Sequence, residues 1–404
     1  MPSAEISASQ AAPDADTLPR RARWRDRKRY LWLLGLVVPV LPFRAVHLAE
    51  RFDSELWLWL GPIVIFGVFP SLDLLIGKDP SNPPDRAVKA LEEDRYYRWL
   101  TYAFIPIQYA ALVFACHVWA SGALGWSGSL GLAVTVGMVA GVAINTAHEL
   151  GHKRPALERW LAKLSLAQTG YGHFFVEHNR GHHVLVATPE DPASARLGES
   201  FWEFLPRTVR GSLRSAIRIE RQRLAQRGQP FFSSGNDLLS AWAMSAALFG
   251  GLVAVFGIGI APWLAVQAVL GFSLLEVVNY IEHYGLLRRR REDGSTEPCR
   301  PEHSWNANDV ASNLFLYHLQ RHSDHHAHPA RRYQALRHFE EAPQLPAGYA
   351  GMIPLACVPP LWRRVMDRRV LAHHGGDVTR ANIHPRARER ILARYGAAAT
   401  GASA

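Results

Sequence analysis

The chain has 404 residues, 48% of them hydrophobic, and its 45 Lys and Arg outnumber its 35 Asp and Glu, which gives a formal net charge of +10. This composition excludes a disordered chain and a collagen-like one. The three cysteines form no CxxC pair, so a disulfide framework and a thiolate metal site are excluded as well. Two features remain to be explained: the hydrophobic residues are gathered in long blocks, and histidine occurs 19 times.

The apolar blocks come in three pairs along the chain. One pair covers 30–49 and 56–76, the second fills 98–148 with a turn of small residues in its middle, and the third covers 238–260 and 263–284. A helix needs about 20 residues to cross roughly 30 Å of hydrocarbon, so these blocks suit membrane spans. The sequence therefore predicts an all-α integral membrane protein with six transmembrane helices and a cytoplasmic, histidine-rich helical cap.

The charged segments beside the blocks predict the orientation of the chain. Basic residues at 20–28 precede the first block, those at 78–98 follow the second, and those at 288–291 follow the sixth. In the three loops on the opposite side, Arg51 is the only Lys or Arg residue. Because Lys and Arg of short loops stay on the cytoplasmic side, both termini and the histidine clusters are expected to be cytoplasmic.

Six regions follow from these boundaries. They are a basic cytoplasmic N-terminal segment at 1–29, transmembrane helices 1 to 4 at 30–147, a cytoplasmic histidine-rich insert at 148–236, transmembrane helices 5 and 6 at 237–286, a cytoplasmic histidine-rich and C-terminal region at 287–395, and a flexible tail at 396–404.

The histidines form three clusters and one single site. The clusters are His148-Glu-Leu-Gly-His152, Glu177-His178-Asn-Arg-Gly-His182-His183 and His322-Ser-Asp-His325-His326. Residues three and four apart share a face of a helix, so the histidines of each cluster are expected to point at one centre. Imidazole suits iron, copper and zinc. The set is too large for one ion with an open position and suits two: His148, His152, His178, His182, His183, His283, His322, His325 and His326.

Polar neighbours of these histidines are expected to orient the rings, as residues around metal ligands commonly do. Asn279 strengthens the case for His283, and His318 precedes His322 by one helical turn. The carboxylates expected to hydrogen-bond a ligand ring are Glu149, Glu177, Asp191, Glu282 and Asp324.

Two other kinds of protein share parts of this pattern. His148-Glu149-x-x-His152 fits the zinc metalloprotease motif, but a protease site would leave six other aligned histidines unexplained. A metal transporter would place its ligands near the membrane midplane, whereas the clustered histidines and His283 lie at the ends of the predicted spans or outside them, and His117, inside a span, is in no cluster.

Four motifs together resemble the membrane-bound alkane 1-monooxygenases, which are non-haem di-iron enzymes of bacteria. They are H-E-L-G-H, E-H-N-R-G-H-H, N-Y-I-E-H-Y-G and L-Q-R-H-S-D-H-H-A-H-P, and the similarity runs over about 30–377. The third motif separates this family from the wider set of His-box desaturases and hydroxylases. A membrane fatty-acyl desaturase or hydroxylase of that set is the nearest alternative.

The resemblance implies a function in hydrocarbon degradation in the bacterial inner membrane. Two non-haem iron ions, held in the cap by the nine histidines, would hydroxylate the terminal methyl of n-alkanes to 1-alkanols with dioxygen. Electrons would come from NAD(P)H through a reductase and rubredoxin. Because this chain has no CxxC pair, rubredoxin is expected to be a separate molecule, or else a domain to which the Ala/Gly-rich tail at 396–404 is the start of a linker.

The resemblance also places control of chain length along the second span. An alkane offers no polar handle and dissolves in the bilayer, so an apolar tube must orient it. The candidate channel residues are Trp57, Trp59, Ile65 and Phe69.

An arginine-rich segment after the second cluster predicts a basic amphipathic helix. Such a helix rests on the headgroups of anionic membrane lipid or docks an acidic partner, and nucleic acid is not an expected partner. Because rubredoxins are acidic, the candidates for docking are Arg210, Arg214, Arg218 and Arg221.

Overall fold

The computed structural model describes residues 24–396, so the predicted tail and most of the predicted N-terminal segment lie outside it. Within the described residues the chain is helical and contains isolated β-bridges but no strand. Six helical segments are long and apolar enough to cross a membrane, as predicted. They are Arg29–Phe52, Glu55–Ile76, Arg95–Ala120, Trp126–Gly151, Asp237–Phe256 and Ile258–His283. The protein is therefore a multi-pass membrane protein.

The first two spans are composite, and the other four are nearly continuous. The first joins the 3₁₀ helix η2 (Arg29–Val40) to α1 (Leu41–Phe52), and Pro39 and Pro42 lie at their junction. Proline lacks the amide hydrogen that a continuous helix needs there. The other segments of the spans are η3 (Glu55–Trp59), α2 (Leu60–Ile63), the π-helix η4 (Val64–Val68), α3 (Phe69–Ile76), α5 (Arg95–Ala120), α6 (Trp126–Gly151), α11 (Asp237–Phe256), the 3₁₀ turn η7 (Ile258–Ile260) and α12 (Ala261–His283).

The helices α6 and α12 pack closely and form the centre of the bundle. A side chain at Gly137 would lie 2.9 Å from the backbone oxygen of Gln267, and one at Gly141 would lie 2.8 Å from a methyl of Leu274. Glycine at these positions lets the two helices approach, which is how membrane helices commonly associate. Both helices end in predicted ligands, so this contact brings His148 and His283 to one end of the bundle.

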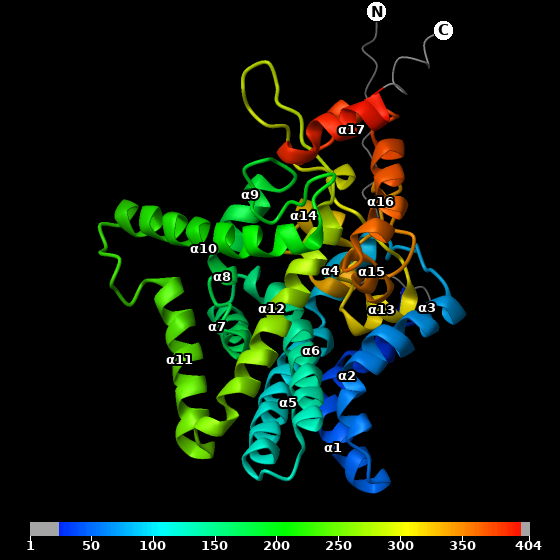
Figure 1. Cartoon of the computed structure of the whole chain (residues 1–404). Coiled ribbons are helices and arrows are strands. Elements are labelled where there is room, and N and C mark those ends of the chain that lie inside the picture. Colours follow the sequence, from blue (N-terminus) through cyan, green and yellow to red (C-terminus); the bar gives the residue numbers. More distant parts are fainter. Residues whose placement is uncertain (1–23, 397–404) are drawn as a thin grey trace, which may run out of the picture.

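The remaining elements form a cap over that end (Figure 1). The long helix α10 (Phe201–Gln226) begins with a capping box between Ser200 and Glu203 and crosses the direction of the spans. The other helices of the cap are α4 (Asp85–Glu93), α8 (Phe174–Glu177), the π-helix η6 (His178–His182), α9 (His183–Leu185), α13 (Val310–Phe315), α14 (His322–Ala327), α15 (Tyr349–Ala356), α16 (Pro359–His373) and α17 (Arg388–Tyr395), joined by loops and short 3₁₀ turns. The helix α7 (Ala156–Leu166) instead lies beside the spans (Figure 1), where the carbonyl of Leu164 accepts a hydrogen bond from Tyr109 of α5 and the hydroxyl of Ser165 donates to the carbonyl of Ala143 of α6.

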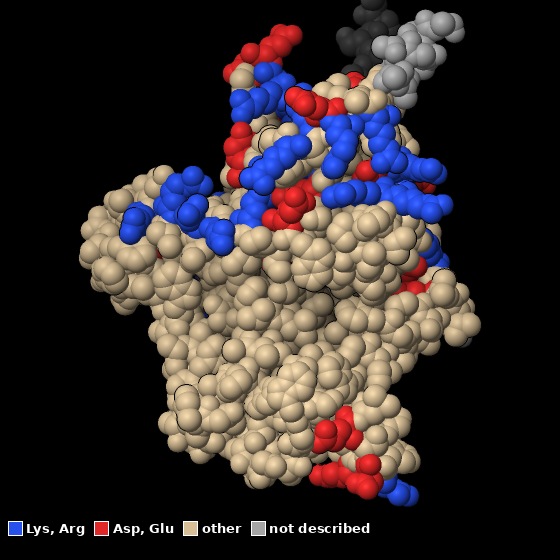
Figure 2. Space-filling model, in the orientation of Figure 1, with Lys and Arg blue, Asp and Glu red and all other residues tan. Residues whose placement is uncertain are grey.

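The cap and the spans differ in the charge of their surfaces. Figure 2 shows Lys, Arg, Asp and Glu gathered over the cap and a broad band without charge below it. A smaller charged group lies at the opposite end, where the loop between the first two spans carries Glu50, Arg51 and Asp53. The uncharged band is the surface that a bilayer would cover.

Candidate metal centre

The nine predicted histidines lie together where the bundle meets the cap, and they form two groups. Within each group, one possible ligand atom from every residue lies within 4.8 Å of the others. The five-histidine group consists of His148, His152, His178, His183 and His325, and the four-histidine group consists of His182, His283, His322 and His326.

The π-helix η6 explains why neighbouring histidines serve different groups. Its backbone hydrogen bonds close over five residues instead of four. His178 therefore pairs with His183, with Nε2 atoms 3.1 Å apart, and His182 joins the other group. The expectation that this cluster points at one centre was wrong, because it assumed an α-helical repeat.

The short helix α14 also contributes to both groups. His322 and His326 lie one turn apart, and their Nε2 atoms are 2.9 Å from each other. His325 is rotated by about 100° from His326 and belongs to the five-histidine group, where its Nε2 lies 3.1 Å from that of His183. Only the cluster His148 and His152 points at one group as predicted.

The chemistry of these side chains fits metal ions. Burial lowers the pKa of His178, His322 and His326 well below the ordinary 6.5, so these rings are neutral, which is the form that binds metal. Several buried ring nitrogens have no hydrogen-bond partner within residues 24–396, and a buried polar atom without a partner is costly. Among these atoms are the Nε2 atoms of His148, His152, His182 and His283.

Two of the predicted carboxylates contact ligand rings. Asp191 lies 2.9 Å from Nδ1 of His182 and also accepts a hydrogen bond from the Ser194 hydroxyl at 2.6 Å. Glu282 lies 3.1 Å from Nε2 of His322 and accepts from the Tyr349 hydroxyl at 2.9 Å. Asp191 therefore contacts the ring nitrogen of His182 that is opposite its unpartnered Nε2, whereas Glu282 contacts the same Nε2 of His322 that faces His326.

Three other predicted neighbours have different partners. Glu149 pairs with Lys153, 3.1 Å away, one helical turn along, and Asp324 accepts hydrogen bonds from the Arg331 guanidinium. His318 contacts Trp32 and the carbonyl of Tyr333, because the positive φ of His318 breaks the helix assumed before His322. These residues brace the segments that carry ligands and do not hydrogen-bond the nine rings.

The last two predicted neighbours, Asn279 and Glu177, lie beside the metal centre but form no hydrogen bond with a histidine ring. Asn279 donates to Glu276 at 3.2 Å and lines the cavity described below. Glu177 is buried, and its Oε1 has no hydrogen-bond partner among the described residues.

An apolar chamber of about 70 Å³ lies beside both histidine groups. His148 and His178 of the first group and His322 of the second line it. Two of the predicted channel residues, Ile65 and Phe69, also line it.

The two tryptophans predicted for the channel lie elsewhere on the second span. Trp57 packs against Phe52, and Trp59 packs against Gly131. Neither lines the chamber or the groove beside it, so the structure does not support the prediction for these two residues.

A larger apolar groove of about 640 Å³ adjoins the chamber, and Leu274 and Ile353 line both cavities. It follows α12 from Ala265 to Val277, which is about 18 Å at 1.5 Å per residue. Val269, which also lines it, is 53% exposed, so the groove opens on the uncharged surface of the bundle.

The four candidate docking arginines lie on α10, as predicted for a basic amphipathic helix. All are exposed, and none is in an ion pair within the part of the chain that the structure describes. Arg221 lies over the ring of Phe231. Two other arginines of α10, Arg207 and Arg223, pair with buried glutamates instead.

Comparison with known proteins shows the family to which the chain belongs. The fatty acid desaturase family model matches residues 124–356. The alkane 1-monooxygenase of Acinetobacter baylyi is 48% identical over 396 residues, which cover 97% of each chain. The chain belongs to the alkane 1-monooxygenase family. Within this family, the protein of Ectopseudomonas oleovorans is 44% identical over 94% of each chain. The xylene/toluene monooxygenase hydroxylase component of Pseudomonas putida is a more distant relative, 29% identical over 81% of this chain and 85% of the relative.

Membership of the alkane 1-monooxygenase family confirms the resemblance seen in the four motifs. Several residues that brace the ligand segments were not predicted from the sequence, among them Lys153, Arg180 and Arg331. Arg180 stands between two ligands in the second motif, and this position was the one available indication of its importance.

Proposed function

We propose that this protein hydroxylates the terminal methyl group of n-alkanes to give 1-alkanols. The reaction takes one molecule of dioxygen, two electrons and two protons, and it releases one molecule of water. The observation that carries the proposal is the apolar chamber, which His148, His178 and His322 line, in a chain whose relatives are named alkane 1-monooxygenase. An apolar pocket beside metal ligands suits a substrate without polar groups.

We propose that the two histidine groups hold two iron ions. Neutral imidazoles suit iron, and nine of them provide enough donors for two ions. Iron, when bound, would supply the activation of dioxygen. The chain's own contribution is to hold the nine rings in two fixed groups and to line the reaction space with apolar side chains that exclude water.

The alkane would reach the chamber from the bilayer through the groove along α12. The chamber, at about 70 Å³, admits only the end of a chain, whereas the groove, at about 640 Å³, has room for the remaining methylenes. Leu274 and Ile353 lie between the two spaces. A narrow chamber favours the terminal carbon by shape, because the substrate offers nothing to recognise by hydrogen bonds.

Electrons would come from NAD(P)H through a reductase and rubredoxin. The exposed arginines of α10 support docking of an acidic protein of this kind, and such docking should weaken as the salt concentration rises. The loop charges support a bacterial inner membrane protein with both termini and the metal centre in the cytoplasm.

The fatty acid desaturase match keeps an acyl-chain desaturase as a second candidate. Both candidate enzymes act on a substrate that lies in the bilayer, so the two functions are distinguished by their products. Membranes containing the protein would be supplied with rubredoxin, its reductase, NADH, oxygen and a mixture of n-alkanes and acyl lipids. We expect 1-alkanols by gas chromatography and mass spectrometry, and none with His148→Ala. New double bonds in acyl chains without 1-alkanols would overturn the proposal.

A further inference from the structure

The backbone of η6 must be held accurately in place, because this short segment supplies histidines to both groups. His178 and His183 enter the five-histidine group and His182 enters the four-histidine group. A π-helical turn is rare and usually marks a functional site. Relaxation to an α-helical turn would bring His182, instead of His183, into line with His178. The surroundings must therefore hold this turn in place.

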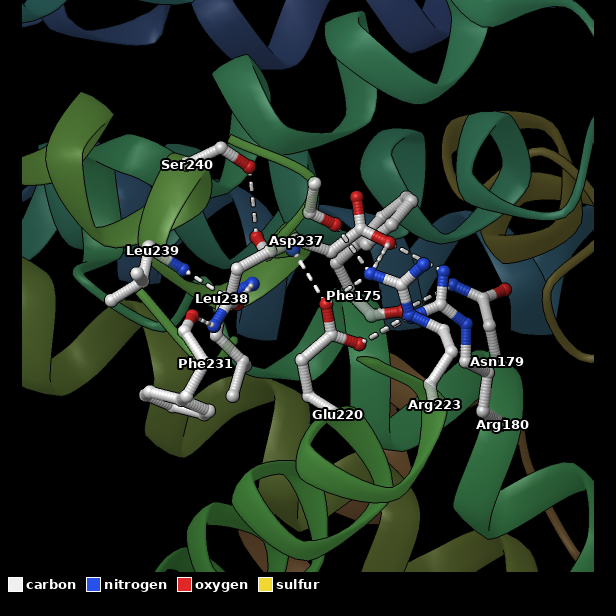
Figure 3. Close-up of polar contacts among 12 residues, drawn as sticks. Phe175, Asn179, Arg180, Glu220, Arg223, Phe231, Asp237, Leu238, Leu239 and Ser240 are labelled. Atoms are coloured by element: carbon white, nitrogen blue, oxygen red, sulfur yellow. Dashed lines mark hydrogen bonds and ion pairs between the residues drawn. The ribbon is translucent and has the colours of Figure 1, made fainter. Parts of the chain in front are cut away.

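One ion-pair cluster contacts the centre of this turn. The two terminal nitrogens of Arg180 donate hydrogen bonds to Glu220 of α10 at 2.9 Å and to Asp237 of α11 at 2.5 Å (Figure 3). Glu220 is fully buried and also accepts from Nε of Arg223 and from the backbone N–H of Asp237, at 2.8 and 2.7 Å. Asp237 accepts a further bond from Lys163 at 2.7 Å.

The next residue of η6, Gly181, packs closely against α10. A side chain at Gly181 would lie 2.9 Å from a methyl of Ile219 and 3.3 Å from the hydroxyl of Ser215, both on α10. The turn is thus fixed by close packing at Gly181 and by directed hydrogen bonds at Arg180. Arg180 uses the planar, two-pronged geometry of its guanidinium, which lysine cannot reproduce.

We propose that Arg180 and Glu220 are positioning residues that hold the π-helical turn so that its two histidines, His178 and His182, and the adjoining His183 reach both metal groups. The proposal rests on the proposed iron centre. Loss of the contact frees the turn and lowers the affinity for metal, while the rings themselves remain. Residues that orient metal ligands typically change metal affinity by about 10- to 100-fold when they are replaced.

The test compares Arg180→Met with Arg29→Met in the full-length protein. Arg29 pairs with Asp94, and the side chain of Arg29 is 34% exposed against 32% for Arg180, but its ion pair lies at the start of the first span. Ferrous iron would be titrated into metal-free protein, with iron per chain and the Mössbauer spectrum as readouts. The thermal midpoint of the metal-free protein reports on the fold separately.

We expect at least a tenfold loss of iron affinity and an altered Mössbauer spectrum for Arg180→Met, a partial recovery for Arg180→Lys, and wild-type values for Arg29→Met. Glu220→Gln keeps the shape of the side chain and should reproduce the loss even where Arg180→Met folds poorly. Wild-type iron affinity and spectrum in Glu220→Gln would overturn the proposal. A wild-type protein that binds no iron would instead overturn the proposed function.

Discussion

The two histidine groups differ in how the protein supports them. All members of the four-histidine group are buried, and Asp191, Glu282 and the carbonyl of His303 contact three of its rings. In the five-histidine group, His152 and His183 are only partly buried. No residue other than histidine hydrogen-bonds one of its rings among residues 24–396.

We infer that the protein itself organises much of the four-histidine group, through the contacts of Asp191 and the His303 carbonyl with Nδ1 of His182 and His283, whereas a bound ion would organise the five-histidine group. Partners on the outer side of a ligand fix its orientation and tautomer before metal arrives. The four-histidine group should therefore keep its geometry without metal, whereas the rings of the five-histidine group should reorganise.

The largest expected effect follows from removing a ligand of the four-histidine group. His326→Ala leaves three histidines there and should lower the rate of 1-alkanol formation by more than about 100-fold, above the range for residues that only support ligands. His152→Ala leaves four histidines in its group and should cost less. Rates would be measured by gas chromatography, with iron content determined on the same samples. A larger loss of rate for His152→Ala than for His326→Ala would contradict the expected difference between the two groups.

Removing the carboxylate behind His182 should have the next largest effect. Asp191→Asn keeps the shape of the side chain but removes the charge that favours a proton on Nδ1 of His182. We expect iron affinity to fall by about 10- to 100-fold. Asp293→Asn alters an exposed loop carboxylate and serves as the control. Equal iron affinities for the two variants would show that the four-histidine group does not depend on its carboxylates.

Chelation should release the two ions in separate steps. Since the five-histidine group is less buried, its ion is expected to leave about tenfold faster. Iron in solution would be followed over time after adding a chelator to detergent-solubilised protein. His152→Ala should accelerate the fast step alone. A single step with all the iron would mean that the two groups do not differ in stability.

The smallest effect concerns the chamber, which both groups border. Ile65→Trp fills space beside His148 and His322 and should shorten the longest alkane accepted by a few carbons, with little change for short ones. Ile63→Trp, two residues away, alters a side chain that is 44% exposed and outside the chamber, so its product profile should stay as in the wild type. The profile is read from a mixture of n-alkanes. An unchanged limit in Ile65→Trp would exclude this position from the channel.

The sequence predicted the elements whose pattern is local. Six spans follow from uninterrupted apolar blocks, and the nine histidines stand out through their spacing. The division into groups of five and four was not predictable, since spacing implies a face only for a known helix type, and η6 is a π-helix. For this reason His182 and His183, expected at one centre, fall into different groups.

Contacts between segments that are distant in the chain could not be predicted from the sequence either. Arg180 faces Glu220, His322 faces Glu282, and Trp59 faces Gly131, because the packing of helices decides which neighbour each side chain meets. The two carboxylates that contact His182 and His322 were among five equivalent candidates, and only the fold distinguishes them.

Iron analysis of three purified proteins tests the two-group centre most directly. The proteins are the wild type, a double variant of the five-histidine group (His152→Ala with His183→Ala) and one of the four-histidine group (His182→Ala with His326→Ala). We predict two iron ions per chain in the wild type and one in each double variant, with 1-alkanol formed by the wild type alone. A single ion in the wild type, or two ions kept by either double variant, would contradict the account.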